Sequence, residues 1–190
     1  MDYYFSRTYM ARIFLALTLE KGINDQIIEI KKDLKSNLLK DVNISWQRND
    51  QHHLTVYFVG EMEPEQISQM NEDLCELNLT GFSRTIDITA ISFFPNKNSQ
   101  VLSAIVKPDS HLNNLYQEVE KIVVNIGLGS ELKAYKPHIT LGRFKDIDRP
   151  QYEFRIFDEP LKGKVKQLNI FESEFDKGKT KFTPLESLEF

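Results

Sequence analysis

The chain has 190 residues, a length that suits one well-filled domain, and 41% of them are apolar and 27% charged, as in ordinary globular proteins. Its formal net charge of −4 argues against a sequence-independent grip on long nucleic acid, which needs many cationic contacts, but leaves room for a local basic site for one phosphate. No stretch approaches the roughly 20 continuous apolar residues that span a bilayer, and no basic region precedes the first apolar run, so we expect a cytoplasmic protein without a membrane partner.

The first elements are an apolar run and an amphipathic pattern. Residues 11–19 (ARIFLALTL) form a run of strand length, which we predict to be the first strand. The stretch 24–39 spaces its apolar residues three or four apart, as a helix with one buried face does. The residues predicted to form that face are Ile27, Ile30, Leu34 and Leu38.

Helix start and stop signals divide the rest of the chain. Pro64 suits the first turn of a second helix, which Gly81 ends, and Asp109 or Ser110 can cap a third. After the first two elements, the prediction is strands 42–46 and 53–59, helix 65–79, strands 85–93 and 101–106, a helix from 110 to about 127, and strands 138–144, 164–173 and 181–188, with a tight connection at 177–179.

Consecutive strands among interleaved helices predict an α+β fold with a mixed or antiparallel sheet. Each half of the chain pairs a helix with a strand that carries His-x-Thr, and the two histidines lie nearly half the chain apart. This repeat predicts two lobes that face each other across a cleft. We expect one domain over residues 11–190, preceded by an N-terminal extension at 1–10, and nothing requires more than a monomer.

The first His-x-Thr strand has polar residues on one face. Alternate side chains of a strand point to the same side, so His53 and Thr55 should project together. Leu54, Val56 and Phe58 should then point the other way, into the core.

The second strand repeats the pattern with His138 and Thr140. Two imidazoles that titrate near pH 6.5 can serve as base and acid for the opening of a phosphodiester, one on each side of the phosphorus. Threonine hydroxyls can donate to the nonbridging oxygens. The pair therefore predicts a phosphodiesterase that needs no metal. Structural histidines are the alternative, but two matches inside apolar strands are rarely accidental.

Other reactive side chains have simpler interpretations. His52 should point away from His53 at the strand edge, and His111 should be solvated in the first turn of a helix. The single cysteine, Cys75, cannot form an intramolecular disulfide and should be a small buried residue. Beside neither motif histidine does the sequence show a cluster with metal-ligand spacing.

Five ordered segments give the chain a specific resemblance. It resembles the two-histidine phosphoesterase superfamily, in particular the RNA 2′,3′-cyclic phosphodiesterases, also described as 2′-5′ RNA ligase-like proteins. The segments that match, in order, are ARIFLALTL, HLTVYFVGE, FFPNKNSQVLSAIV, KPHITLGRF and FESEFDKGKTKFTPLESL.

The resemblance implies a bilobal fold with two pseudo-symmetric lobes of sheet, outer helices and a central cleft. It also implies hydrolysis of RNA or nucleotide 2′,3′-cyclic phosphates to 2′-phosphates without a cofactor. His53 would protonate the leaving 3′ oxygen and His138 would activate water, an order that substrate orientation could reverse. Thr55 and Thr140 match the motif threonines and would bind the phosphate.

Two further positions and three alternatives stay open. Arg143 matches a frequent family arginine that could bind phosphate, but strict alternation would place it opposite His138 unless a bulge occurs at Gly142 or the strand ends. Tyr57 stands where many members carry a basic residue. The same site could instead act on 2′-5′ oligonucleotides or an ADP-ribose cyclic phosphate, or the protein could bind RNA ends without catalysis.

Overall fold

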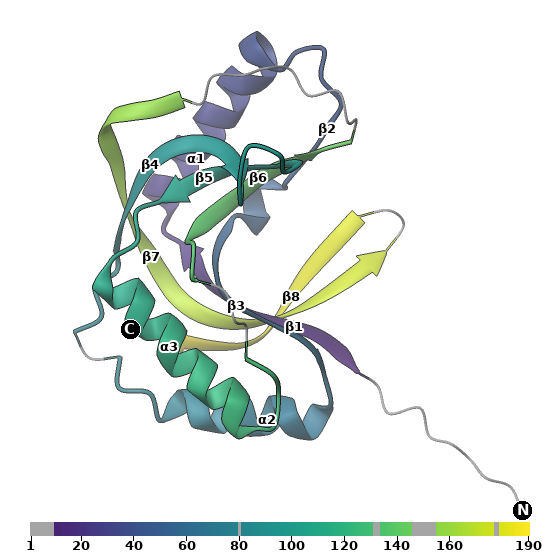
Figure 1. Ribbon diagram of the computed structural model, residues 1–190, viewed down its shortest axis with the longest axis vertical. Helices are drawn as coiled ribbons and strands as arrows, with labels where there is room; N and C mark the ends of the chain where they lie inside the picture. The colour runs from purple at the N-terminus through teal and green to yellow at the C-terminus, as the bar shows by residue number, and fades with distance from the viewer. Residues whose placement is uncertain (1–9, 80, 131–133, 146–154, 177–178) are drawn as a thin grey trace, which may run out of the picture.

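The computed structural model describes residues 10–79, 81–130, 134–145, 155–176 and 179–190 and has the α+β fold that the sequence predicts (Figure 1). The strands are β1 (Ala11–Leu19), β2 (Ile44–Trp46), β3 (His53–Met62), β4 (Thr85–Phe94), β5 (Val101–Val106), β6 (His138–Phe144), β7 (Arg155–Asp176) and β8 (Lys179–Glu189). The helices are α1 (Lys21–Asp33), a π-helical turn η1 (Leu34–Leu38), a 3₁₀ turn η2 (Asn49–Gln51), α2 (Pro64–Cys75) and α3 (Ser110–Asn125).

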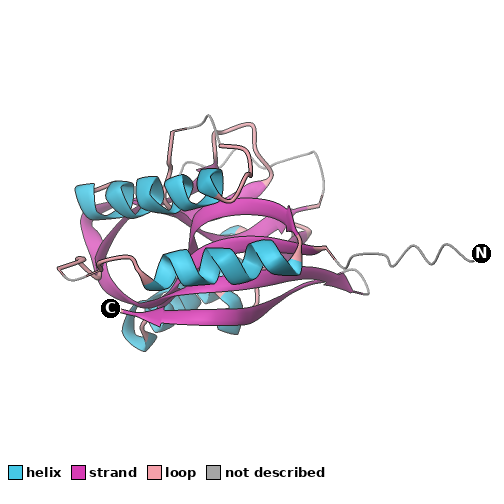
Figure 2. Ribbon diagram, turned by 90° about the horizontal axis from the view of Figure 1, so that it is seen from below, coloured by secondary structure: helices cyan, strands magenta, loops and turns pink. Residues whose placement is uncertain are grey.

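The strands form one sheet in the order β1-β3-β6-β5-β4-β7-β8, with β2 paired to β6. Each of these pairs is antiparallel. Strand β1 also pairs with β7, so the ladder closes into a ring. In Figure 2 the helices lie on the outside of the strands.

The long strand β7 joins two halves of the molecule. Residues 155–164 pair with β4, whereas 165–172 pair with β1. Figure 1 shows α1, β4, β5 and β6 in the upper half, and α2, α3, β1, β3 and β8 in the lower. On the other side of the ring, one residue pair between β3 and β6 links the halves. The two lobes thus meet where the His-x-Thr motifs lie.

Helix α1 and the turn after it bury most of the predicted face, but not its last residue. Its buried residues are Ile23, Ile27 and Lys31, and the series continues with Leu34 in the π-helical turn. Leu38 is 51% exposed, so its predicted place on the buried face was wrong. The π-helical turn widens the backbone after Asp33 and rotates the face away from Leu38. Lys31 is buried as well, although the apolar spacing did not place it on that face.

Several boundaries differ from the prediction for physical reasons. Helix α1 begins at Lys21 instead of residue 24, because β1 runs almost directly into it. Helix α2 ends at Cys75, and Leu77 and Leu79 pack against the core as irregular chain. Cys75 is exposed, so its predicted burial was wrong. Strand β7 begins at residue 155 because its first part completes the β4 edge, a partner that local sequence does not reveal.

The start of α3 follows the prediction. Asp109 is the N-cap, and its carboxylate accepts a hydrogen bond of 2.8 Å from the backbone N–H of Leu112. The extension at residues 1–9 and the connection at 177–178 lie outside the described residues. Within the described part of the chain, no helix is both long and apolar enough to cross a membrane.

Candidate active site

The two His-x-Thr motifs lie side by side in the sheet, where β3 and β6 form a single antiparallel residue pair. Leu54 of β3 lies opposite Ile139 of β6, and both side chains are fully buried. Because alternate side chains of a strand point to opposite faces, the residues that flank this pair share the other face. These residues are His53, Thr55, His138 and Thr140. The structure therefore brings together all four residues that the sequence singled out.

The same β-bulge follows both motifs. In β3 the register with β1 skips Val56, and in β6 the register with β5 skips Leu141. Each skipped residue comes directly after the motif threonine, so the alternation of side chains reverses at the same place in both halves. The pseudo-symmetry therefore extends beyond the tripeptides.

The bulge in β3 reverses one prediction. Tyr57 is buried, 1% exposed, where its ring lies 5.4 Å from that of Tyr116, whereas Phe58 is 37% exposed. Phe58 was expected in the core, and that expectation was wrong. Its partner Phe14 lies on the same face of β1 as Thr18, the partner of His53, so Phe58 shares the histidine face.

The bulge in β6 decides the position of Arg143. Arg143 pairs with Val101, and Thr140 pairs with Ser103 on the same face of β5. The exposed Arg143 therefore shares a face with His138, and the bulge that the sequence required lies at Leu141, one residue before Gly142. Phe58 and Arg143 occupy equivalent positions, each three residues after its threonine.

Both catalytic candidates have the same imidazole orientation. Nδ1 of His53 lies 2.9 Å from the carbonyl oxygen of Gln51, and Nδ1 of His138 lies 2.9 Å from that of Lys136. A carbonyl only accepts, so Nδ1 carries the proton and donates in each case. Each neutral ring then presents an unprotonated Nε2. The backbone two residues before each histidine thus fixes the tautomer that a general base needs.

Aromatic rings surround both imidazoles. The ring of His53 lies 5.1 Å from those of Phe14 and Phe182, and Phe94 stacks on His138 at 3.4 Å. Burial is the main cause that lowers the pKa of His53 to about 4, and the positive charge of a protonated His138 contributes to that same shift. Burial also lowers the pKa of His138 below its ordinary value. Both rings are therefore neutral near pH 7 in the free protein.

A cavity opens beside each histidine. The His138 cavity, of about 560 Å³, is lined by residues that include Thr55, Phe58, Phe94, Tyr135 and His138. Tyr135 donates a hydrogen bond of 3.1 Å to the carbonyl oxygen of Thr55, which ties the segment before β6 to β3. The His53 cavity, of about 290 Å³, is lined by residues that include His53, Asn169, Phe171 and Phe182.

A buried polar network supports the segment before His53. His52 comes directly before the first residue of β3, and its side chain is buried, 6% exposed. Its Nδ1 lies 2.7 Å from Oδ1 of Asn24, and its Nε2 lies 2.8 Å from the ammonium of Lys31. Burial lowers the pKa of His52 to about 3, and that of Lys31 to about 8. Lys31 on the buried side of an amphipathic helix was the available sequence signal.

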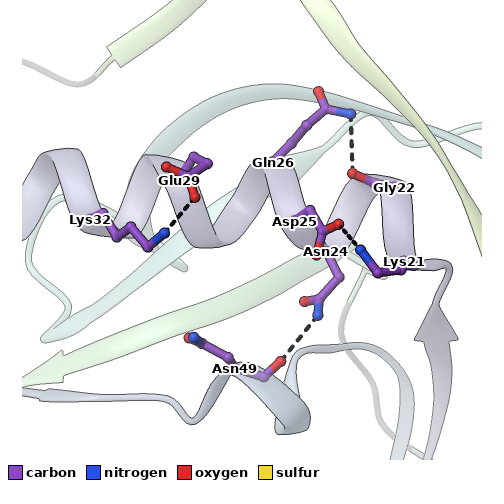
Figure 3. Close-up of polar contacts among 8 residues, drawn as sticks. All are labelled: Lys21, Gly22, Asn24, Asp25, Gln26, Glu29, Lys32 and Asn49. Carbon is purple, nitrogen blue, oxygen red and sulfur yellow. Dashed lines mark hydrogen bonds and ion pairs between the residues drawn. The ribbon is translucent and has the colours of Figure 1, made fainter.

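Asn24 and Asn49 give the network a second link. Nδ2 of Asn24 donates to the carbonyl oxygen of Asn49 at 3.2 Å, which joins α1 to the turn η2 (Figure 3). His111, in contrast, is exposed on α3 as predicted. Among the described residues, no group of three or more His, Cys, Asp or Glu side chains could hold a metal ion.

Comparisons with known proteins agree with this geometry. The family model described as LigT-like phosphoesterase matches residues 17–102 and 106–181. The chain is 28% identical over 187 residues to an RNA 2′,3′-cyclic phosphodiesterase of Thermotoga maritima, a match that covers 88% of this chain and 97% of the relative. It is 28% identical over 137 residues to a protein of the same name from Methanocaldococcus jannaschii, which covers 72% and 73%.

Solved structures share the fold. A crystal structure from Thermus thermophilus superimposes with a TM-score of 0.74 at 22% identity and covers 94% of this chain and 97% of its own. E. coli LigT complexed with 3′-AMP superimposes with a TM-score of 0.70 at 22% identity and covers 95% and 98%. At such low sequence identity, the similarity shows only that the fold is shared.

Proposed function

The chain belongs to the LigT-like phosphoesterase family, and we propose that it hydrolyses the 2′,3′-cyclic phosphate of an RNA end or nucleotide to a 2′-phosphate, with its two histidines and no metal ion. The observation that carries the proposal is the mirrored pair of imidazoles. Each histidine is on the shared face, and each has Nδ1 committed to a carbonyl two residues earlier. Relatives named RNA 2′,3′-cyclic phosphodiesterase support the substrate.

In the proposed reaction, Nε2 of His138 takes a proton from water, and the water oxygen attacks phosphorus in line with the 3′ oxygen. The bond from phosphorus to the 3′ oxygen breaks, and protonated His53 gives its Nε2 proton to that oxygen. The bond to the 2′ oxygen remains, which leaves a 2′-phosphate. His138 then releases its proton to solvent, and His53 takes one up, so each turnover consumes one water.

The remaining residues of the shared face stabilise the crowded phosphorane. Hydroxyls of Thr55 and Thr140 donate to nonbridging oxygens, and the guanidinium of Arg143 supplies positive charge on the His138 side. His53 must be protonated to act as the acid, although burial holds its pKa at about 4 in the free protein. A bound phosphate anion favours the imidazolium and raises that pKa. A donor of low intrinsic pKa then releases its proton readily.

The test is turnover of a 2′,3′-cyclic mononucleotide in EDTA, with the product identified by phosphorus NMR. We expect a 2′-monophosphate, and a loss of about 10²–10⁴-fold in kcat for His53→Ala and for His138→Ala, the range typical of general acid–base catalysts. His111→Ala, a matched change at an exposed histidine, should keep full activity. Abolition by EDTA, or full activity in both active-site variants, would overturn the proposal.

A substrate panel separates the alternatives. Faster cleavage of a 2′-5′ dinucleotide or of ADP-ribose 1″,2″-cyclic phosphate would replace the proposed substrate but keep the site. Tight binding of cyclic-phosphate RNA with no product over hours would indicate a binding protein. A single domain at 11–190, a monomer and a cytoplasmic location stay predictions, which sedimentation, limited proteolysis and cell fractionation test.

A further inference from the structure

The His53 cavity lies between the start of β3 and the β7–β8 hairpin, which projects from the lower half of the molecule in Figure 1. The cyclic phosphate must lie between the two histidines, but His53 and His138 open onto different cavities. The nucleoside can extend into either cavity, with the attacking water on the opposite side of the phosphorus from the leaving oxygen. Three features of the His53 cavity bear on that choice.

The first feature is a buried acceptor without a partner. Asn169 lines the cavity and is 2% exposed. Its Nδ2 donates to Oγ of Ser187 at 2.5 Å and lies 3.5 Å from the carbonyl oxygen of Glu186, which fixes the orientation of the amide. Its Oδ1 is buried and accepts no hydrogen bond from any described residue. Such an acceptor destabilises the protein unless something donates to it.

The strand register points Asn169 toward the site. Asn169 pairs with Ala16 of β1, and Ala16 pairs in turn with Thr55 of β3. Side chains of directly paired residues share one face of a sheet. Asn169 therefore lies on the same face as Thr55 and His53, two strands from the motif.

The second feature is an aromatic wall. The rings of Phe171 and Phe182 line the cavity, and that of Phe182 meets His53 edge to face at 5.1 Å. Phe14 supports both from behind, at 5.2 Å from Phe171 and 5.0 Å from Phe182. Aromatic faces held in this way are typical stacking surfaces for nucleobases.

The third feature is the division of the hairpin into two faces. Phe171, Ser173 and Phe175 alternate along one face of β7, and Phe175 is 78% exposed. Glu172 and Glu174 lie on the opposite face, where Glu174 pairs with Lys181. The carboxylates of Glu172 and Glu174 thus lie away from the face that continues out of the cavity, and Asp50, which also lines the cavity, forms an ion pair with Arg48 at 2.6 Å. A polyanionic strand can follow that face without meeting the carboxylates of Glu172 and Glu174.

We propose that the His53 cavity binds the nucleoside that carries the cyclic phosphate, with its base against Phe171 and Phe182 and one of its N–H or O–H groups donating to Oδ1 of Asn169. The assignment rests on the proposed function, because the leaving 3′ oxygen stays attached to this nucleoside. The acid His53 must contact that oxygen, so the nucleoside lies on the His53 side. Water then enters from the His138 cavity.

The test compares two substrates that differ in the nucleoside. Adenosine 2′,3′-cyclic phosphate carries a base, whereas glycerol 1,2-cyclic phosphate carries none. In Asn169→Leu the ratio of the two kcat/KM values should fall about tenfold, since a lost hydrogen bond of about 1.4 kcal/mol is a factor of ten. The matched change Asn114→Leu, at an exposed residue of α3, should keep the ratio. An unchanged ratio in Asn169→Leu, or a fall only in Phe58→Leu, would overturn the proposal.

A binding measurement on the unaltered protein covers the case in which the variant fails to fold. Adenosine 2′-monophosphate should shift the side-chain amide resonances of Asn169 in a proton–nitrogen NMR titration. Saturation without a shift at Asn169 would contradict the subsite. Failure of the proposed function is a separate result, because the unaltered protein would then turn over neither cyclic phosphate, whatever the Asn169 resonances do.

Discussion

Replacement of Lys31 by methionine tests the network that supports the active-site segment. The Lys31 ammonium donates to the carbonyl oxygen of Gln47 at 2.5 Å and to Oδ1 of Asn49 at 2.9 Å, and lies 2.8 Å from Nε2 of His52. The segment also reaches the second motif, because the backbone N–H of Gln47 donates to the carbonyl oxygen of Leu141 at 2.8 Å. One buried cation thus holds the chain that orients the first motif.

The magnitude follows from three acceptors and one cation. Hydrogen bonds from a charged donor contribute about 1.5–3 kcal/mol each to stability. The loss of three such bonds in Lys31→Met therefore removes about 4.5–9 kcal/mol of stabilisation. Removal of the buried ammonium returns several kcal/mol of desolvation, because burial already lowers its pKa to about 8. We expect a net loss of about 3 kcal/mol in the free energy of unfolding.

Urea unfolding at pH 7 measures this loss, with fluorescence of Trp46, the only tryptophan, as the probe. The control is Lys32→Met, at the next position of α1, where the exposed ammonium forms an ion pair with Glu29 (Figure 3). That change should stay within about 0.5 kcal/mol. In Lys31→Met, kcat should also fall, because the segment that carries Gln51, whose carbonyl orients His53, loses its hydrogen bonds to Lys31 at Gln47 and Asn49. Equal stability of the two variants would refute the reasoning.

Three further changes probe packing, capping and proton linkage. In Gly163→Ala the added methyl group would lie 2.3 Å from Cβ of Ile23 in α1, so thermal unfolding should show a loss of about 2 kcal/mol or more in the free energy of unfolding. The control is Gly129→Ala, whose methyl group would have no atom within 4 Å. Similar losses in the two variants would contradict the packing of Gly163 against α1. Asp109→Ala removes the cap of α3 and should cost about 1 kcal/mol in urea unfolding, and no loss would show that the cap is unimportant. The pKa values of His52 and His53, about 3 and about 4, lie below 6.5, so the unfolded chain binds more protons and stability falls as the pH drops from 6.5 toward 4. His52→Gln should reduce that fall, and equal pH dependence of the two proteins would contradict the burial of His52.

The sequence predicted those parts of the fold that local pattern specifies. Strands β5 and β6 have the predicted ends, because apolar runs are bounded there by polar or proline-containing segments. The four motif residues share a face as alternation requires. The first part of β7 was missed because its partner is β4, far away in the chain, and the pattern of one strand does not show its neighbours. Burial of Lys31 was missed because spacing separates polar from apolar residues and does not show which acceptors a buried ammonium will meet.

The bulges show why the site is more symmetric than its sequence. If side chains alternated regularly along β3 and β6, the histidine and the threonine of each motif would share the face, and Phe58 and Arg143 would lie on the other side. The skipped residues Val56 and Leu141 bring both onto the histidine face at equivalent positions. Phe58 in turn holds the guanidinium of Arg12, whose carbon lies 4.9 Å from the ring centroid. Each half therefore places an arginine on the histidine face, directly from β6 in one and through an aromatic ring in the other. In the proposed reaction, both arginines would supply positive charge to the anionic phosphate.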